Sequence, residues 1–261
     1  MPQCTADFEG LCLLYQAMEV GLHKIRAMAR TNKELAEELI RDGYLKSPLL
    51  IRAFRAINRK DFVPKEFWDE AYGNYPLDIG ERQTISQPLT VAFMLELLSS
   101  QPGENILDIG TGSGWVAAIL AYVVSQNSGD QNVGRVISIE RIKKLSESAE
   151  KNLRKYGFIK KGILKFIVGD GSRGYEAEAP YDKIIVGAAV QVAEIRRSPE
   201  GRRRTAAAGE RIPIAWKKQL KVGGRIVAPV GNSVVVVDKI SEKKFRSREY
   251  FGFSFVPLVK G

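Results

Sequence analysis

The sequence of 261 residues predicts an α/β fold, in which a doubly wound, mostly parallel sheet is covered by helices on both faces. Three observations lead to this fold class. From residue 105 onward, short apolar runs alternate with helical patterns, and the first apolar run ends in a glycine-rich turn. Near the carboxyl terminus, two apolar runs follow each other with no helical pattern between them, which indicates an antiparallel end to the sheet.

The amino-terminal part predicts helices. Residues 1–31 are expected to form an amphipathic helical extension, because apolar side chains recur there at helical spacing. They are Leu11, Leu14, Tyr15, Met18, Leu22 and Ile25. Two further helical patterns are expected between residues 32 and 61, the second beginning near Pro48, and residues 63–82 are expected to form a loop. Residues 32–261 would then form one catalytic domain.

The remaining elements follow in order along this domain. We expect a helix at 91–98, a helix of small and apolar residues after the glycine-rich turn, and further helices at 143–156 and 212–220. Strands are expected at 105–109, 135–140, 164–168, 183–186 and 225–229, and an antiparallel pair at 234–240 and 251–259. Residues 191–211 carry six arginines, Arg196, Arg197, Arg202, Arg203, Arg204 and Arg211, and predict an insertion rather than core.

Composition excludes several classes of protein. Hydrophobic residues make up 44% of the chain and charged residues 27%, which does not fit a disordered, collagen-like or coiled-coil protein. The two cysteines, Cys4 and Cys12, and the one histidine, His23, cannot supply a zinc cluster or a histidine-centred triad in the body of the chain. We find no membrane-spanning or signal segment and expect a cytoplasmic protein. The net charge of +10 indicates an anionic partner without identifying it.

The glycine-rich turn is the most specific local motif. An apolar strand runs through Asp108 into Gly110-Thr111-Gly112-Ser113-Gly114, where glycines allow a ligand to approach the backbone. A dinucleotide fingerprint would require glycine where this chain has Trp115, and no Walker lysine follows. The D-x-G-x-G pattern instead favours S-adenosylmethionine (SAM), with a Rossmann-like sheet and these residues at the cofactor.

Acidic residues end the next two predicted strands. Glu140 is placed to accept hydrogen bonds from the two ribose hydroxyls, and Asp170, followed by Gly171, to accept from the adenine amino group. Each acid taken alone is also compatible with a solvated carboxylate at a strand end. Their recurrence at successive strand ends beside the glycine turn favours a cofactor site.

Motifs and residues that the sequence lacks narrow the choice of methyl acceptor. Amino-methylating nucleic-acid enzymes carry [DN]-P-P-[YF] after the fourth strand, where this chain has Val186-Gly187-Ala188-Ala189. Neither cysteine lies near the predicted sheet, as a cytosine C5 enzyme would require. Since no histidine base is evident, the acceptor should need little deprotonation, and a carboxylate is already ionised at pH 7.

At several positions the sequence resembles the protein-L-isoaspartate O-methyltransferases. The resemblance is carried by Gln83-Thr84-Ile85-Ser86-Gln87-Pro88, the turn at 108–114, Ser138-Ile139-Glu140-Arg141, Gly169-Asp170-Gly171, Ala179-Pro180-Tyr181-Asp182, residues 219–225 and residues 255–261. It implies transfer of the SAM methyl group to the free α-carboxylate of L-isoaspartyl residues in damaged proteins. The ester then collapses to a succinimide, and repeated cycles restore aspartate.

The resemblance also implies residue roles. Ser86 would be the active-site residue, orienting the acceptor carboxylate, although its position before Pro88 also fits a helix cap. Thr84, Ile85 and Arg141 would join the cofactor site, and Ala188, Ala189, Val256, Pro257 and Leu258 would contact substrate. The chain departs from the family at Val190, where proline is usual, and continues from there into the arginine-rich stretch.

Two rival functions stay open at this point. One is an RNA methyltransferase, which the positive charge favours, and the other is a SAM- or RNA-binding module without catalysis. We expect isoaspartyl proteins as partners, a monomer, and no nucleic acid, metal or membrane partner. The arginine-rich stretch 195–208 is a solvated loop, a basic rim that attracts acidic substrates, or a segment that attracts RNA.

Overall fold

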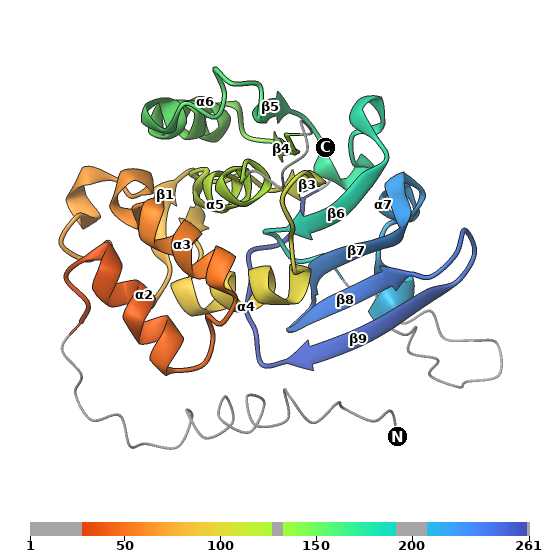
Figure 1. The fold of residues 1–261 in the computed structure, drawn as a ribbon, viewed down its shortest axis with the longest axis horizontal. Coiled ribbons are helices and arrows are strands. Elements are labelled where there is room, and N and C mark those ends of the chain that lie inside the picture. Colours follow the sequence, from red (N-terminus) through yellow and green to blue (C-terminus); the bar gives the residue numbers. More distant parts are fainter. Residues whose placement is uncertain (1–27, 127–132, 192–207, 260–261) are drawn as a thin grey trace.

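The computed structural model describes residues 28–126, 133–191 and 208–259. Most of the predicted helical extension 1–31 and most of the arginine-rich insertion therefore lie outside the described residues, and residues 28–31, which are described, are not helical. A seven-stranded sheet with the order β5-β4-β3-β6-β7-β8-β9 forms the centre of the molecule (Figure 1). Strands β3 to β7 pair in parallel, and β8 and β9 complete the sheet as antiparallel strands, which confirms the predicted fold class.

The strands lie close to the positions that the apolar runs predict. They are β3 (Asn105–Ile109), β4 (Arg135–Glu140), β5 (Leu164–Val168), β6 (Tyr181–Val186), β7 (Leu220–Val230), β8 (Ser233–Lys239) and β9 (Phe245–Phe251). The prediction of a strand at 251–259 is wrong. Gly252 adopts a left-handed φ of 96° where β9 ends, and Pro257 has no N–H to donate to a ladder.

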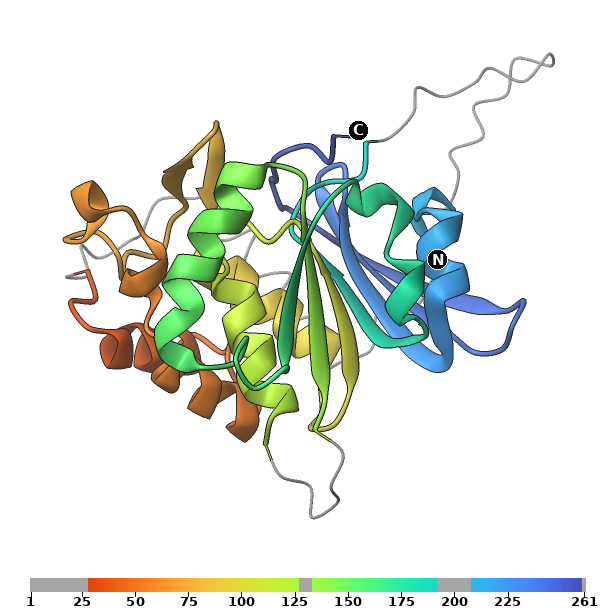
Figure 2. The ribbon, with the colours of Figure 1, turned by 90° about the horizontal axis from the view of Figure 1, so that it is seen from above.

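Helices cover the two faces of the sheet unequally. On one face, α4 (Pro88–Leu98), α5 (Trp115–Val124) and α6 (Lys143–Leu153) pack on the sheet, with α2 (Asn32–Arg41) and α3 (Pro48–Ala56) outside them (Figure 2). The other face carries α7 (Ile214–Gln219), whose Trp216 is fully buried. Helices α4 and α5 are apolar on nearly all sides because each lies between the sheet and the outer helices.

Short elements connect the layers. Single 3-10 turns are η1 (Arg59–Phe62), η2 (Lys65–Phe67), η3 (Arg154–Tyr156), η4 (Gly171–Arg173), η5 (Glu176–Glu178) and η6 (Ala208–Arg211). The segment expected to be a loop, 63–82, contains η2 and also β1 (Leu77–Gly80), which pairs with β2 (Gln83–Ile85) in a separate hairpin. Periodicity misses this hairpin because its first strand has four residues, of which only Leu77 is buried. Among the described residues, no helix is long and apolar enough to cross a membrane.

Candidate functional site

A pocket opens at the carboxyl ends of β3, β4 and β6. The strand order places β4 on one side of β3 and β6 on the other, although all three strands run in parallel. The order in which successive strands are added to the sheet therefore reverses at β3. Open α/β sheets bind ligands at such a switch point. The pocket is closed on its remaining sides by β2 with the start of α4 and by the carboxyl-terminal segment 255–259.

The glycine turn after β3 forms the floor of the cofactor side. Gly110, Gly112 and Gly114 have positive φ angles of 88°, 55° and 92°, which residues with a Cβ rarely adopt. At Gly114 a Cβ would also lie 2.8 Å from Leu153 Cδ1, so the Leu153 side chain of α6 would have to move. The backbone geometry thus explains why the turn requires these three glycines.

Glu140 holds the turn from the end of β4. Its side chain is buried, and its two carboxylate oxygens accept hydrogen bonds from the backbone N–H groups of Gly112, at 3.0 Å, and Ile142, at 2.9 Å. A carboxylate has about four acceptor positions. Two therefore remain for hydroxyl groups of a ligand in the pocket.

Asp108 lies beneath the turn at the end of a buried hydrogen-bond chain. Ser138 Oγ donates to Asp108 Oδ2 at 2.6 Å, and the Thr111 and Ser138 hydroxyls lie 2.7 Å apart. Burial raises the pKa of Asp108 to about 7, with a smaller contribution from the nearby Glu140 charge, whereas the Ser138 hydrogen bond opposes the shift. The Asp108 carboxyl group therefore changes charge near neutral pH.

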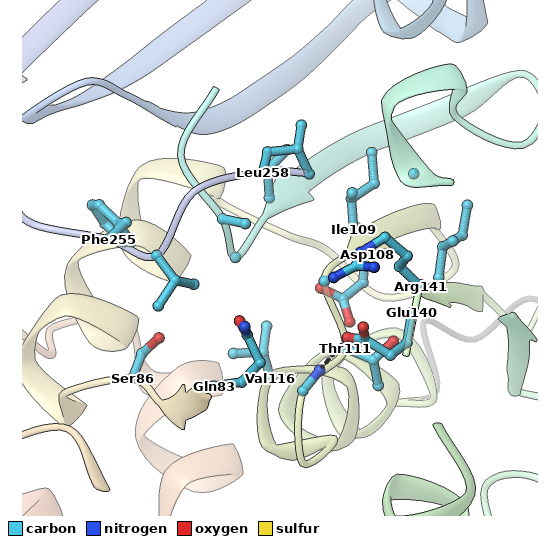
Figure 3. Close-up of a pocket in the computed structure, with 18 of the residues that line it drawn as sticks. Gln83, Ser86, Asp108, Ile109, Thr111, Val116, Glu140, Arg141, Phe255 and Leu258 are labelled. Atoms are coloured by element: carbon cyan, nitrogen blue, oxygen red, sulfur yellow. Dashed lines mark hydrogen bonds between the residues drawn. The ribbon is translucent and has the colours of Figure 1, made fainter. Parts of the chain in front are cut away.

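Ser86 faces the same pocket from the opposite side. Figure 3 shows its hydroxyl and the Gln83 side chain pointing into the cavity, across from Asp108, Thr111 and Glu140. The structure also tests the alternative that Ser86 caps the amino terminus of a helix. Gln87 is the N-cap residue of α4, which begins at Pro88, so that alternative is wrong.

The carboxyl-terminal segment forms the roof. Ala189 N–H donates to the Val256 carbonyl at 2.8 Å, and Leu258 N–H donates to the Ala189 carbonyl at 2.7 Å. These two bonds hold the segment against the cavity, which Phe255 and Leu258 (Figure 3) line together with Val256. The segment after β6 continues alongside β7, since Val190 N–H donates to the Pro229 carbonyl at 2.9 Å.

Most residues singled out from the sequence line this one pocket. They are Thr84, Ile85, Ser86, Asp108, Gly110, Thr111, Gly112, Ser113, Glu140, Arg141, Gly171, Ala188, Val256, Pro257 and Leu258. Three others do not line it. Gly114 packs against α6, the Asp170 carboxylate accepts a hydrogen bond from Ser172 N–H at the start of η4, and Ala189 is buried behind the roof. The contact of Asp170 with adenine stays a prediction.

Sequence reasoning missed several lining residues. Gln83, Trp115 and Phe255 stood inside or beside recognised strings but were given no role, and Val91 and Met94 come from the first turns of α4. The positions of Gln83, Trp115 and Phe255 next to recognised motifs are the sequence signal that indicates a role in the pocket. Within the described residues, no group of three or more His, Cys, Asp or Glu side chains is arranged to hold a metal ion.

Comparison with known proteins points to one family. The family model for protein-L-isoaspartate(D-aspartate) O-methyltransferase matches residues 30–195 and 196–261. A protein-L-isoaspartate O-methyltransferase of Methanopyrus kandleri is 38% identical over 238 residues, which cover 90% of this chain and 93% of that protein. A protein-L-isoaspartate O-methyltransferase 2 of Archaeoglobus fulgidus is 41% identical over 229 residues, or 87% and 91% of the two chains.

Solved structures agree in fold. A Plasmodium falciparum protein described as a protein-L-isoaspartate O-methyltransferase, in complex with S-adenosyl-L-homocysteine, superposes with a TM-score of 0.70. It shares 22% sequence identity, and the match covers 89% of this chain and 100% of that one. A second protein-L-isoaspartate O-methyltransferase has a TM-score of 0.68 at 26% identity, over 87% of this chain and 65% of the other.

Proposed function

The chain belongs to the protein-L-isoaspartate(D-aspartate) O-methyltransferase family, and we propose that it methylates the free α-carboxylate of L-isoaspartyl residues in damaged proteins with SAM as the methyl donor. One observation carries this proposal. The pocket brings the hydroxyl of Ser86, from the family string 83–88, together with the glycine turn and Glu140. An acceptor carboxylate and a cofactor can therefore meet in one cavity.

The residues present fit SAM. The Glu140 carboxylate uses two of its acceptor positions on Gly112 and Ile142, so it retains capacity for two ribose hydroxyls. Apolar side chains of Ile109, Val116 and Ile142 also line the pocket, as an adenosine moiety requires. When bound, SAM supplies a methyl group on a positively charged sulfur atom.

The protein's own groups then orient the acceptor. The Ser86 hydroxyl donates a hydrogen bond to the isoaspartyl carboxylate and leaves one carboxylate oxygen free to attack. No general base is needed, because the acceptor is ionised at neutral pH. Phe255, Val256 and Leu258 cover the cavity with apolar surface and exclude water, which would otherwise solvate the carboxylate and lower its reactivity.

A labelling experiment tests the proposal. The protein is incubated with radiolabelled SAM and one of three acceptors: an isoaspartyl peptide, the same peptide with normal aspartate, or bulk tRNA. Label on the isoaspartyl peptide alone is the expected result. Equal labelling of both peptides contradicts the repair function, and label on tRNA favours the RNA methyltransferase that the charge of the chain left open.

A further inference from the structure

Arg59 is a buried cation directly behind the acceptor side of the pocket. It opens η1, and its side chain is 0% exposed. The guanidinium donates four hydrogen bonds to backbone carbonyls. Nη1 donates to Ala71, at 2.7 Å, and to Gly73, at 3.3 Å, and Nη2 donates to Tyr75, at 3.1 Å, and to Ser86, at 3.2 Å.

These bonds join two separate stretches of chain. Three of the carbonyls belong to the loop 71–75, which leads into β1, and the fourth belongs to Ser86 itself. The planar guanidinium fork fixes the directions of its donors, which a flexible ammonium group does not. Arg59 therefore sets the position of the Ser86 backbone, and with it the origin of the hydroxyl that enters the pocket.

The surroundings of Arg59 provide little compensation for burying its charge. Burial lowers its pKa to about 9, so the side chain remains protonated at neutral pH despite the loss of solvent. In the part of the chain that the structure describes, no carboxylate forms an ion pair with it. The Trp115 ring, whose centroid lies 5.4 Å from the guanidinium carbon, contributes a cation–π contact.

We propose that Arg59 is a positioning residue for methyl transfer, acting through Ser86 by holding its carbonyl against the loop 71–75. The inference rests on the proposed function, because it assigns Ser86 to the acceptor. The cofactor side should depend little on the guanidinium fork, since Glu140 and the glycine turn are held by β3, β4 and their own backbone bonds, and a lysine keeps a cation beside Trp115. Loss of the fork should therefore affect the acceptor and spare the cofactor.

Arg59→Lys tests this separation, because it keeps the charge and removes the fork. We expect kcat/KM for an isoaspartyl peptide to fall about 10- to 100-fold, the scale of a displacement of about 1 Å at a reacting group. Affinity for S-adenosylhomocysteine, measured by calorimetry, should change less than about 3-fold. The matched control is Arg225→Lys, because Arg225 donates to Asp238 and the Leu97 carbonyl, away from the pocket lining, and should keep full activity.

A double-mutant cycle decides whether Arg59 acts through Ser86. In the Ser86→Ala background the hydroxyl is absent, so Arg59→Lys should lower kcat/KM less than about 3-fold further. Equal losses in both backgrounds overturn the proposal and leave Arg59 with a general structural role. A loss of S-adenosylhomocysteine affinity as large as the loss of kcat/KM overturns it as well.

Amide hydrogen exchange gives a readout independent of activity. In Arg59→Lys, the segment 83–90 should exchange faster, whereas the segment 108–114 should keep its protection. If Arg59→Lys does not fold, Arg59→Gln is used in the same cycle and the same exchange measurement. Failure of the unchanged protein to label any isoaspartyl peptide defeats the proposed function, and unchanged exchange at 83–90 defeats the inference about Arg59.

Discussion

Replacement of Glu140 by alanine tests the cofactor half of the pocket. The carboxylate accepts two backbone hydrogen bonds, from Gly112 at 3.0 Å and Ile142 at 2.9 Å, and has capacity for two ribose hydroxyls. A hydrogen bond to a charged group contributes about 1.5–3 kcal/mol net. Because water can occupy the space that the deleted carboxylate leaves and replace part of its hydrogen bonding, we expect SAM affinity to weaken by about 1–3 kcal/mol, or roughly 5- to 150-fold.

Isothermal calorimetry with S-adenosylhomocysteine measures this change, and circular dichroism confirms that the variant is folded. Glu147→Ala is the matched control. Glu147 is an acid on the neighbouring helix α6, half-exposed or more, and its ion pair with Lys143 at 3.8 Å is on the surface. The Glu147→Ala substitution should change the affinity for S-adenosylhomocysteine less than about 2-fold. Unchanged affinity in Glu140→Ala would refute the assignment of Glu140 to the ribose.

Three further predictions concern other parts of the site. Ser86→Ala should lower kcat for an isoaspartyl peptide about 10- to 100-fold, because the hydroxyl holds the acceptor. The affinity for S-adenosylhomocysteine should fall less than about 2-fold, since the hydroxyl does not hold the cofactor. An unaltered kcat at saturating peptide contradicts this prediction. Burial raises the pKa of Asp108 from 3.8 to about 7, so between these values the folded state binds more protons and its stability falls as pH rises. Urea unfolding at pH 5 and pH 8 should therefore show a stability loss that Asp108→Asn lacks, and identical pH dependence in both proteins would disprove it. Gly171→Ala places a Cβ against Ile109 Cγ2 and should cost about 1–3 kcal/mol of unfolding free energy, whereas unchanged stability would show that Ile109 moves freely.

The sheet could be predicted because its signals are local. Strands β3, β4 and β5 lie at 105–109, 135–140 and 164–168, as their apolar runs predict. The edge strand β9 lies at Phe245–Phe251 rather than at the predicted residues 251–259, and the difference has a physical reason. Its residues Phe245–Phe251 include Arg246 and Arg248, which are exposed at the sheet edge, and the half-buried Glu249, which pairs with Arg211. These charged residues break the apolar pattern. The apolar residues that follow belong to the roof of the pocket rather than to the sheet.

The site was predictable where a motif carries it and hidden where distant segments build it. Glu140 and the glycine turn stand within strings whose spacing fixes their place at the strand ends. Arg59 stands in a charged stretch, Asn58-Arg59-Lys60-Asp61, that resembles a surface turn. Its burial depends on carbonyls 12 to 27 residues further along the chain, and no local pattern reports such contacts.

The two halves of the pocket are held by different parts of the fold, and this explains why substitutions should separate their effects. The cofactor half is built from the ends of β3 and β4, whose register is fixed by the central sheet. In the acceptor half, Ser86 follows the β1–β2 hairpin, which pairs outside that sheet, and the roof segment is held by two hydrogen bonds to Ala189. Changes at Glu140 should therefore appear in cofactor affinity, and changes at Ser86 or Arg59 in acceptor turnover. A single variant that lowered both equally would show that the halves are coupled through the protein.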